Sequence, residues 1–154
     1  QTKTVKVKDK AIPTYVRGGS FILMSKLVQT TDHYKADQLE LHYYFDEKEN
    51  TKRTFYNDDG LTANAFEKEN YEILEFEAEY CKRYLKIDFE AELGKNWISS
   101  EKEITLIIHN IINWNPKKIK VNGKRKRILS KENTLTIPVK WNPKKELRIK
   151  ITLQ

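Results

Sequence analysis

Cysteine, glycine and proline are scarce in this 154-residue sequence, which has one, five and four of them respectively. The single cysteine, Cys81, excludes an intrachain disulfide and any metal site built from several thiolates. Because Cys81 stands in a stretch with a strand-like pattern, we expect a small packed side chain rather than a reactive thiol. No apolar run approaches the roughly 20 residues of a membrane-spanning helix, so no membrane partner is expected.

The sequence nevertheless contains enough apolar material to fold, since 38% of its residues are hydrophobic and 11% are aromatic. Its length suits one domain, or one domain with part of another. The segment Thr4–Val7 already has a strand pattern with nothing before it. We therefore expect the sequence to begin inside a larger protein.

Positive charge is concentrated towards the end of the sequence. The net charge is +7, and the residues from Asn113 onward contain 13 lysines and arginines against only Glu132 and Glu146. A basic surface of this kind attracts nucleic acid, anionic lipid or an acidic neighbouring domain. The simpler interpretation, which we favour, is a solvated lysine-rich face that keeps a β domain soluble.

Alternation of apolar and polar residues is the dominant pattern. Residues 74–80 have apolar or aromatic side chains at even positions and glutamate at odd positions, and residues 85–93 repeat the alternation. Successive side chains of a strand point to opposite faces, so each segment has one buried and one solvated face. The short connection Cys81-Lys82-Arg83 predicts a hairpin between them.

Similar segments continue along the rest of the chain, and no amphipathic helix interrupts them. Strands are expected within residues 104–108, 119–121, 135–139 and 147–153. Asn122-Gly123 is a strong signal for a tight turn. Many short strands at this spacing indicate an all-β fold, an antiparallel β-sandwich, over residues 49–154.

The first 48 residues are less regular. Strands are expected at Thr4–Lys8, Thr14–Arg17 and Leu39–Phe45, which are too few to close a sandwich. We interpret residues 1–48 as the end of a truncated, second β-sandwich domain. The charged segment Asp46–Lys52 is the expected boundary between the two parts.

Three segments, in order, resemble glycoside hydrolase family 31, the α-glucosidases and α-xylosidases. Residues 12–22 (IPTYVRGGSFI) resemble a segment of the β-sandwich that directly follows the catalytic barrel of that family, and residues 39–44 (LELHYY) resemble the next strand. Residues 54–62 (TFYNDDGLT) resemble the Tyr-Glu-Asp-Asp-Gly segment that opens a second, distal sandwich. Asn57 stands where the family usually has glutamate.

The resemblance implies a structural role. It implies the non-catalytic C-terminal accessory region of an α-glycosidase, which packs on and stabilises an upstream catalytic (β/α)8 barrel of the same chain. The parent enzyme would hydrolyse α-glucosidic or α-xylosidic bonds, in a periplasmic or secreted setting, with a cytoplasmic one as the alternative. Because the paired catalytic acids belong to the barrel, no catalytic, cofactor-binding or metal residue is expected here.

The motif residues predict backbone turns. Gly18-Gly19 suits a bulge or a sharp bend between two strands, and Arg17 is placed to pair with a carboxylate or carbonyl across a domain interface. Asp58-Asp59-Gly60 predicts a turn in which aspartate side chains accept hydrogen bonds from nearby N–H groups and Gly60 supplies a positive φ. A calcium site is the alternative for the two aspartates.

Two other functions remain open. Trp97, Trp114 and Trp141 would serve a carbohydrate-binding module if their rings lay on the surface, although core or turn packing is the commoner fate of tryptophan in sandwiches. The basic run Lys124–Arg127 would serve polyanion binding. Aromatic residues are sparse around this run, so no nucleic-acid partner is expected.

Overall fold

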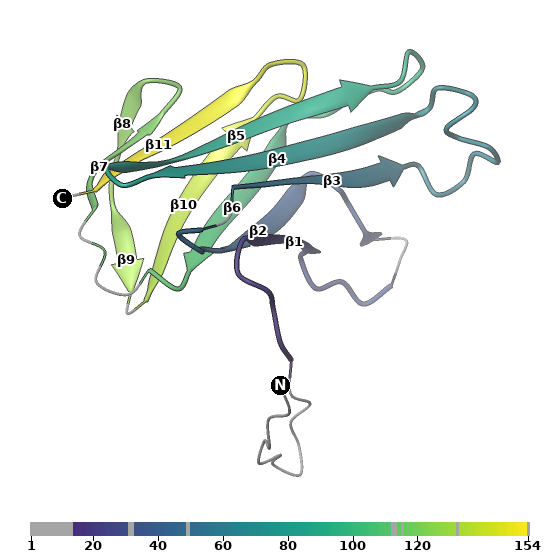
Figure 1. Ribbon diagram of the computed structural model, residues 1–154. Helices are drawn as coiled ribbons and strands as arrows, with labels where there is room; N and C mark the ends of the chain where they lie inside the picture. The colour runs from purple at the N-terminus through teal and green to yellow at the C-terminus, as the bar shows by residue number, and fades with distance from the viewer. Residues whose placement is uncertain are drawn as a thin grey trace, which may run out of the picture.

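The computed structural model describes residues 14–30, 33–48, 50–111, 114, 116–131 and 133–153. Within them, eleven strands form two sheets that lie face to face (Figure 1). This part of the chain has no α-helix, and so none long and apolar enough to cross a membrane. The all-β sandwich expected from the alternating pattern is confirmed.

One layer is a five-stranded sheet with the order β1-β2-β6-β10-β9. Its strands are β1 (Ser20–Ser25), β2 (Gln38–Tyr44), β6 (Lys102–His109), β10 (Thr134–Trp141) and β9 (Leu129–Lys131). Neighbouring strands are antiparallel except β2 and β6, which are parallel, with Leu41 opposite Leu106. The edges of this sheet are therefore β1 and β9.

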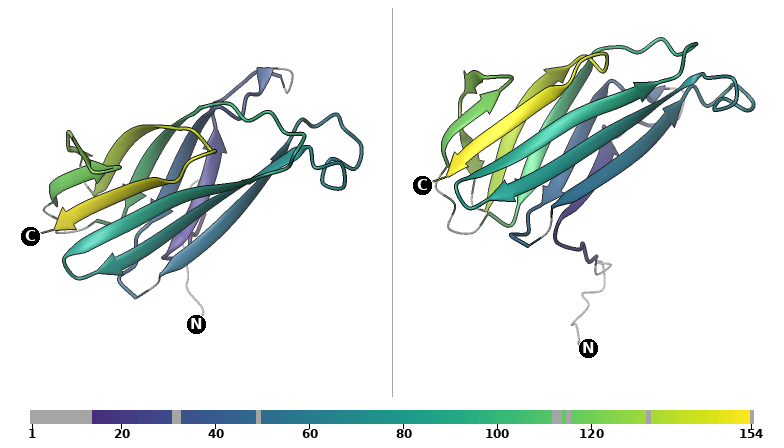
Figure 2. Two further views of the ribbon diagram at one scale, coloured as in Figure 1. Left: turned by 90° about the horizontal axis from the view of Figure 1, so that it is seen from above. Right: turned by 45° about the horizontal axis from the view of Figure 1, so that its top comes forward.

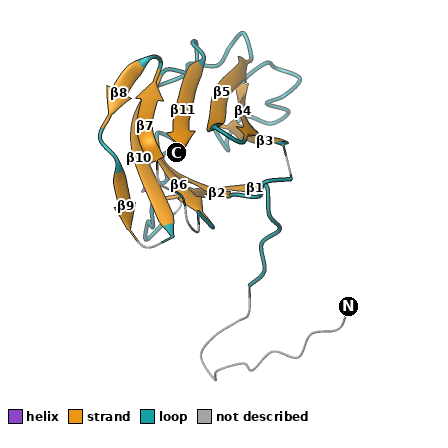
Figure 3. Cartoon of the chain, turned by 60° about the vertical axis from the view of Figure 1, so that its left-hand side comes forward, coloured by secondary structure: helices purple, strands orange, loops and turns teal. Residues whose placement is uncertain are grey.

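The other layer is a six-stranded, fully antiparallel sheet with the order β3-β4-β5-β11-β7-β8. Its strands are β3 (Thr51–Asp58), β4 (Tyr71–Cys81), β5 (Tyr84–Leu93), β11 (Leu147–Leu153), β7 (Pro116–Val121) and β8 (Lys124–Lys126). Figure 3 shows the two layers edge-on, with β7 and β8 above β9 and β10. The loop from β3 to β4 projects beyond the sheets (Figure 2).

The core lies between the sheets and is built from the inward-facing side chains that the alternation predicts. Phe76 on β4 is completely buried. Its ring centroid lies 4.8 Å from that of Phe89 on β5, 6.0 Å from that of Phe21 on β1 and 6.1 Å from that of Trp141 on β10. Because β1 and β10 belong to the opposite sheet, this aromatic cluster joins the two layers.

Both expected tight connections are confirmed. Cys81 at the end of β4 pairs with Tyr84 at the start of β5, which closes the predicted hairpin. Val121 pairs with Lys124 across Asn122 and Gly123, whose φ angles are +46° and +79°. Two successive positive φ values are the signature of the hairpin turn that an Asn-Gly pair favours.

Two segments differ from what the sequence predicts, and a third cannot be compared. Thr14–Arg17 is not a strand; the first described strand is β1, which begins after the positive φ of Gly19 (+78°). The strand expected at Thr4–Lys8 lies outside the described residues. Cys81 is exposed rather than packed, because inward positions on β4 are even-numbered and position 81 is odd.

The boundary expected near residues 48 and 49 does not separate two cores. Strand β2, before this point, pairs along its whole length with β6, after it. Leu41 and Tyr43 of β2 belong to the same buried cluster as Phe76 and Trp141. The described residues from β1 onward therefore form one sandwich, and the division into residues 1–48 and 49–154 is not a division in packing.

Candidate functional site

The Asp58-Asp59-Gly60 segment forms the predicted turn at the end of β3. Asp58 Oδ1 accepts a hydrogen bond from the Gly60 backbone N–H (2.8 Å), and Gly60 has a φ of +67°. Asp59 Oδ1 accepts from the N–H groups of Leu61 (3.0 Å) and Thr62 (2.8 Å). This is the arrangement by which aspartate stabilises a turn through its own side chain.

The second oxygen of Asp59 is also engaged. Asp59 Oδ2 accepts from the Thr62 hydroxyl (2.6 Å) and from the Asn70 side-chain amide (2.8 Å). The Thr62 hydroxyl, the two backbone N–H groups and Asn70 hold the pKa of Asp59 at about 2, below its ordinary value of 3.8. Among the described residues, no group of three or more His, Cys, Asp or Glu side chains is arranged to hold a metal ion.

Beside this turn, a buried ion pair joins the two sheets. Glu72 at the start of β4 and Lys102 at the start of β6 are 0% and 2% exposed, and their charged atoms lie 2.5 Å apart. Glu72 also accepts from Asn57 (2.8 Å) and Ser99 (3.3 Å), and Lys102 donates to the Ala36 carbonyl (3.1 Å). Burying two charges costs several kcal/mol each unless they are paired and further hydrogen-bonded, as they are here.

A pocket of about 300 Å³ opens over this ion pair. Its lining residues come from the β1–β2 loop, the end of β3 and the turn after it, the start of β4, the β5–β6 loop and the start of β6. They are Tyr34, Lys35, Ala36, Asp37, Asn57, Asp58, Asp59, Glu72, Trp97, Ser100 and Lys102. Burial raises the pKa of the Tyr34 phenol, and the charge of Glu72 adds to this effect. The pocket is the place where sequence-distant polar groups, including the Asp58-Asp59 motif, come together.

Two of the four carboxylates that line this pocket, those of Asp59 and Glu72, are engaged in structural interactions. Cleavage needs one carboxyl group with a raised pKa as acid and a second, accessible carboxylate as nucleophile or base. Glu72 is neutralised by Lys102 and out of contact with solvent, and the pKa of Asp59 is lowered. Asp37 Oδ1 and Trp97 Nε1 are buried without a hydrogen-bond partner among the described residues.

The predicted glycine motif lies at the opposite end of β1 from this pocket. The Gly19 N–H donates to the Tyr44 carbonyl (2.7 Å), which starts the pairing of β1 with β2. A Cβ on Gly18 would come within 2.5 Å of Asp46 Oδ2, so a side chain at this position would displace Asp46. The Arg17 side chain is exposed, and the structure does not bring this motif together with Asp58-Asp59-Gly60.

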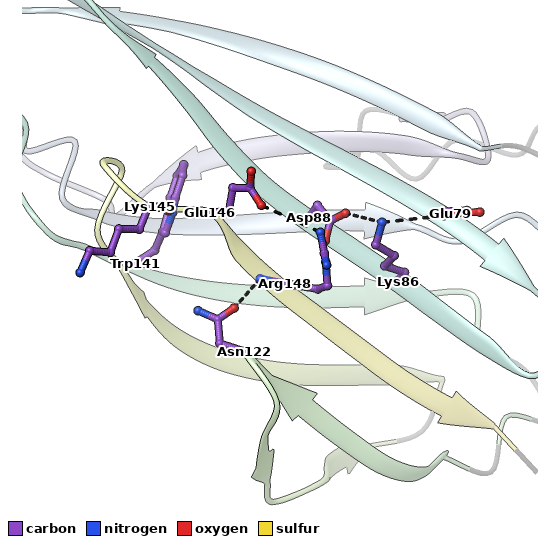
Figure 4. Close-up of polar contacts among 8 residues, drawn as sticks. All are labelled: Glu79, Lys86, Asp88, Asn122, Trp141, Lys145, Glu146 and Arg148. Carbon is purple, nitrogen blue, oxygen red and sulfur yellow. Dashed lines mark hydrogen bonds and ion pairs between the residues drawn. The ribbon is translucent and has the colours of Figure 1, made fainter.

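The three tryptophans do not form a common surface. Trp141 is buried, and its indole N–H donates to the Lys145 carbonyl (2.7 Å; Figure 4), so the proposal that it contacts carbohydrate is wrong. Trp114 is partly buried, with its ring centroid 4.5 Å from that of Phe45. Trp97 is partly buried at the pocket. Core and turn packing therefore account for most of the tryptophan surface.

Fold and site together define a class of protein: a β-sandwich module with a buried polar bridge at one end and no metal cluster among its described residues. No known family model matches the sequence, and no curated protein matches it. The fold was therefore compared with solved structures.

The same fold occurs as one part of several large enzymes that act on carbohydrates. A GH31 dextranase of Flavobacterium johnsoniae superposes with a TM-score of 0.76 at 18% identity, over 89% of this chain and 19% of that enzyme. An α-1,4-glucan lyase of Gracilariopsis lemaneiformis superposes with a TM-score of 0.67 at 15% identity, over 89% of this chain and 16% of the lyase. A GH31 α-xylosidase of Xanthomonas citri gives a TM-score of 0.55 at 16% identity, over 86% and 12% respectively.

This chain therefore spans less than a fifth of the length of the enzymes that it matches. The likeness confirms the resemblance drawn from the three sequence segments at the level of fold. The identities are too low to transfer substrates or catalytic residues.

The buried ion pair can be tested by a double-mutant cycle on Glu72 and Lys102. We expect E72M and K102M each to lower the free energy of unfolding by about 3–5 kcal/mol, since each leaves a buried charge without its partner. The double variant should lose much less than the sum of the two, because Met side chains fill similar volumes without charge. Urea unfolding followed by tryptophan fluorescence measures all four proteins; additive losses would contradict the coupling.

The turn makes a prediction about pH. Because the folded-state pKa of Asp59 (about 2) is below its ordinary value of 3.8, its carboxylate stabilises the fold above the ordinary value, and this is lost as the pH falls through about 2. We expect D59N to be less stable than the wild type at neutral pH and the difference to shrink between pH values of about 4 and about 2. Urea midpoints across this range provide the measurement; parallel curves would count against it.

Proposed function

We propose that this chain is a non-catalytic accessory β-sandwich of a GH31-type α-glycosidase, where it packs on the catalytic domain of the same polypeptide and stabilises it. The proposal rests on how much of each chain the structural match covers: it includes 89% of this chain but only 19% of the dextranase. A small module that is nearly complete within several larger glycosidases is best explained as one of their structural parts. An exported, polysaccharide-degrading parent fits this proposal.

An exposed apolar region supports a docking role. Of the ten large apolar side chains that are exposed in the described residues, five lie between positions 15 and 34. They are Tyr15, Met24, Leu27, Val28 and Tyr34. These residues belong to β1 and its flanking loops, at an edge of the five-stranded sheet. Three of them, Met24, Leu27 and Val28, lie close together at the end of β1 and directly after it, and contiguous exposed apolar side chains mark an interaction site.

The position of this region in the chain suits an intramolecular partner. Residues 14–19 lead away from β1 (Figure 3), so whatever precedes them in a larger protein would approach the sandwich from this side. Leu27 is fully exposed, and Val28 beside it is partly exposed. A catalytic domain that covered both would bury apolar surface at a gain of roughly 25 cal/mol per Å².

The catalytic part of the proposal is tested by activity. We expect the 154-residue chain to release no glucose from maltose and no nitrophenol from chromogenic α-glucosides or α-xylosides, whereas the product of the complete reading frame cleaves at least one of them. The complete product is the positive control. Reproducible turnover by the 154-residue chain that is lost in the D37N variant would contradict the proposal. A reading frame that encodes only this sandwich would also contradict it.

The docking part is tested by paired leucine variants of the complete product. Leu27 and Leu61 are both highly exposed, but only Leu27 lies in the apolar region beside β1. We expect L27S to lower the free energy of unfolding of the complete enzyme, measured by urea unfolding, by about 1–2 kcal/mol of lost burial, and L61S to change it little. In the 154-residue chain alone, both substitutions should be nearly neutral. Equal effects of L27S and L61S in the complete enzyme would refute this docking face.

A further inference from the structure

Charge is distributed unevenly over the outer face of the six-stranded sheet. On the half formed by β3, β4 and β5, cations are paired with acids: Lys52 with Glu75 (2.5 Å) and Lys86 with Asp88 (2.7 Å). The paired region extends to Arg148 on β11, whose guanidinium lies 2.9 Å from Asp88 (Figure 4). Each of these cations therefore has an acidic partner, although acids also face each other on this half, with Glu75 opposite Glu90 and Glu77 opposite Asp88.

The other half of the same face carries a row of cations without such partners. Strand register places Arg125 of β8 opposite Lys120 of β7, and Lys120 opposite Lys150 of β11. Among the described residues, none of the three forms an ion pair with a carboxylate. Lys150 is instead held over the Tyr84 ring, 4.1 Å from its centroid. Since neighbouring strands lie about 4.8 Å apart, the row spans roughly 10 Å.

Such a row is unfavourable for the isolated fold. Like charges directly opposite each other on adjacent strands destabilise a sheet. Opposed like charges also occur on β4 and β5, where Glu75 faces Glu90 and Glu77 faces Asp88, so repulsion alone does not require a ligand. The cation row differs in its sign and spacing, because three positive charges within roughly 10 Å suit an anionic ligand that offsets their repulsion.

A shallow hollow adjoins the row and adds a fourth cation. It has a volume of about 380 Å³ and is lined by Lys120, Asn122, Gly123, Glu146, Arg148 and Lys150. Asn122 Oδ1 accepts from the Arg148 backbone N–H (2.7 Å), and Asp88 holds the guanidinium (Figure 4). Glu146 is the single acid in the lining, 3.9 Å from Arg148. Arg148 is thus fixed in position, whereas Lys120 and Lys150 have no ion pair among the described residues, and Lys150 is held only by the Tyr84 ring.

We propose that the row Arg125–Lys120–Lys150, with the adjoining hollow, binds a linear anionic polysaccharide through its sulfate or carboxylate groups. Single-stranded nucleic acid is a poorer fit, because single strands are held by exposed aromatic rings on which bases stack, and the Tyr84 ring is covered by Lys150. Duplex DNA is distinguished by the test below. The inference rests on the proposed function only for the choice of polysaccharide. Its test needs no catalytic domain, so failure here would leave the proposed function standing.

The test compares two charge-matched double variants of the 154-residue chain. K120Q/K150Q removes two cations from the row, and K52Q/K95Q removes two surface lysines elsewhere, so both have the same net charge. We expect the wild type and K52Q/K95Q to bind heparin with affinities within about twofold of each other, and K120Q/K150Q to bind about tenfold more weakly or worse at low salt. The slope of the logarithm of the binding constant against the logarithm of the salt concentration should become less steep by about one for each lysine removed from the row.

Four ligands separate the possible outcomes. Heparin carries sulfate and carboxylate groups, polygalacturonate carries carboxylates only, dextran is neutral, and duplex DNA is the competing polyanion. Binding to heparin or polygalacturonate but not to dextran is expected, and which of the two binds identifies the anionic group. Equal losses in both double variants, no binding to either anionic polysaccharide, or tighter binding to DNA would overturn the proposal. R125Q is a second variant of the row in case K120Q/K150Q fails to fold.

Discussion

The contact of Phe76 with aromatic rings of both sheets is the interaction on which the rest of the structure depends. Phe76 can be buried only if β4 presents its even-numbered side chains inward. A slip of one residue would place Glu75 and Glu77 in the core instead. The same register fixes the outer face, because each inward side chain determines the direction of its neighbours. The register that places Glu75 opposite Glu90 and Glu79 opposite Lys86 on β4 and β5, and Lys120 opposite Lys150 on β7 and β11, follows from this constraint.

The buried pair Glu72–Lys102 joins the sheets in a different way. Apolar packing joins the layers along their length, but it does not select one partner for one position. A buried ion pair tolerates little displacement, because either charge alone in the core costs several kcal/mol. It therefore fixes how the start of β4 meets the start of β6, at the end where the β3–β4 turn and the pocket lie. Asn57 and Ser99 complete the pair, which ties the Asp58-Asp59 turn to the sandwich.

Local features of this fold could be predicted from the sequence, and long-range pairings could not. Alternation identified the β4–β5 hairpin, and Asn-Gly identified the turn after β7. The same alternation, continued by one step, places Glu72 with Leu74 and Lys102 with Ile104 on inward faces, so both buried charges were within reach of sequence reasoning. That they meet depends on strands about 30 residues apart. The parallel pairing of β2 with β6 is equally invisible to local pattern, which is why a domain boundary was expected between them.

This parallel pairing has a consequence for how the module connects to a larger enzyme. Because β2 covers one side of β6 along its whole length, removing it would expose an inner strand and its hydrogen-bonding groups. The sandwich therefore needs β2, which is an integral strand of the five-stranded sheet. Strand β1 is an edge, so its free side and its exposed apolar neighbours are where the proposed catalytic domain would dock. The basic face on β7, β8 and β11 lies towards the opposite side of the sandwich (Figure 1), where a docked catalytic domain would leave it open to polymer.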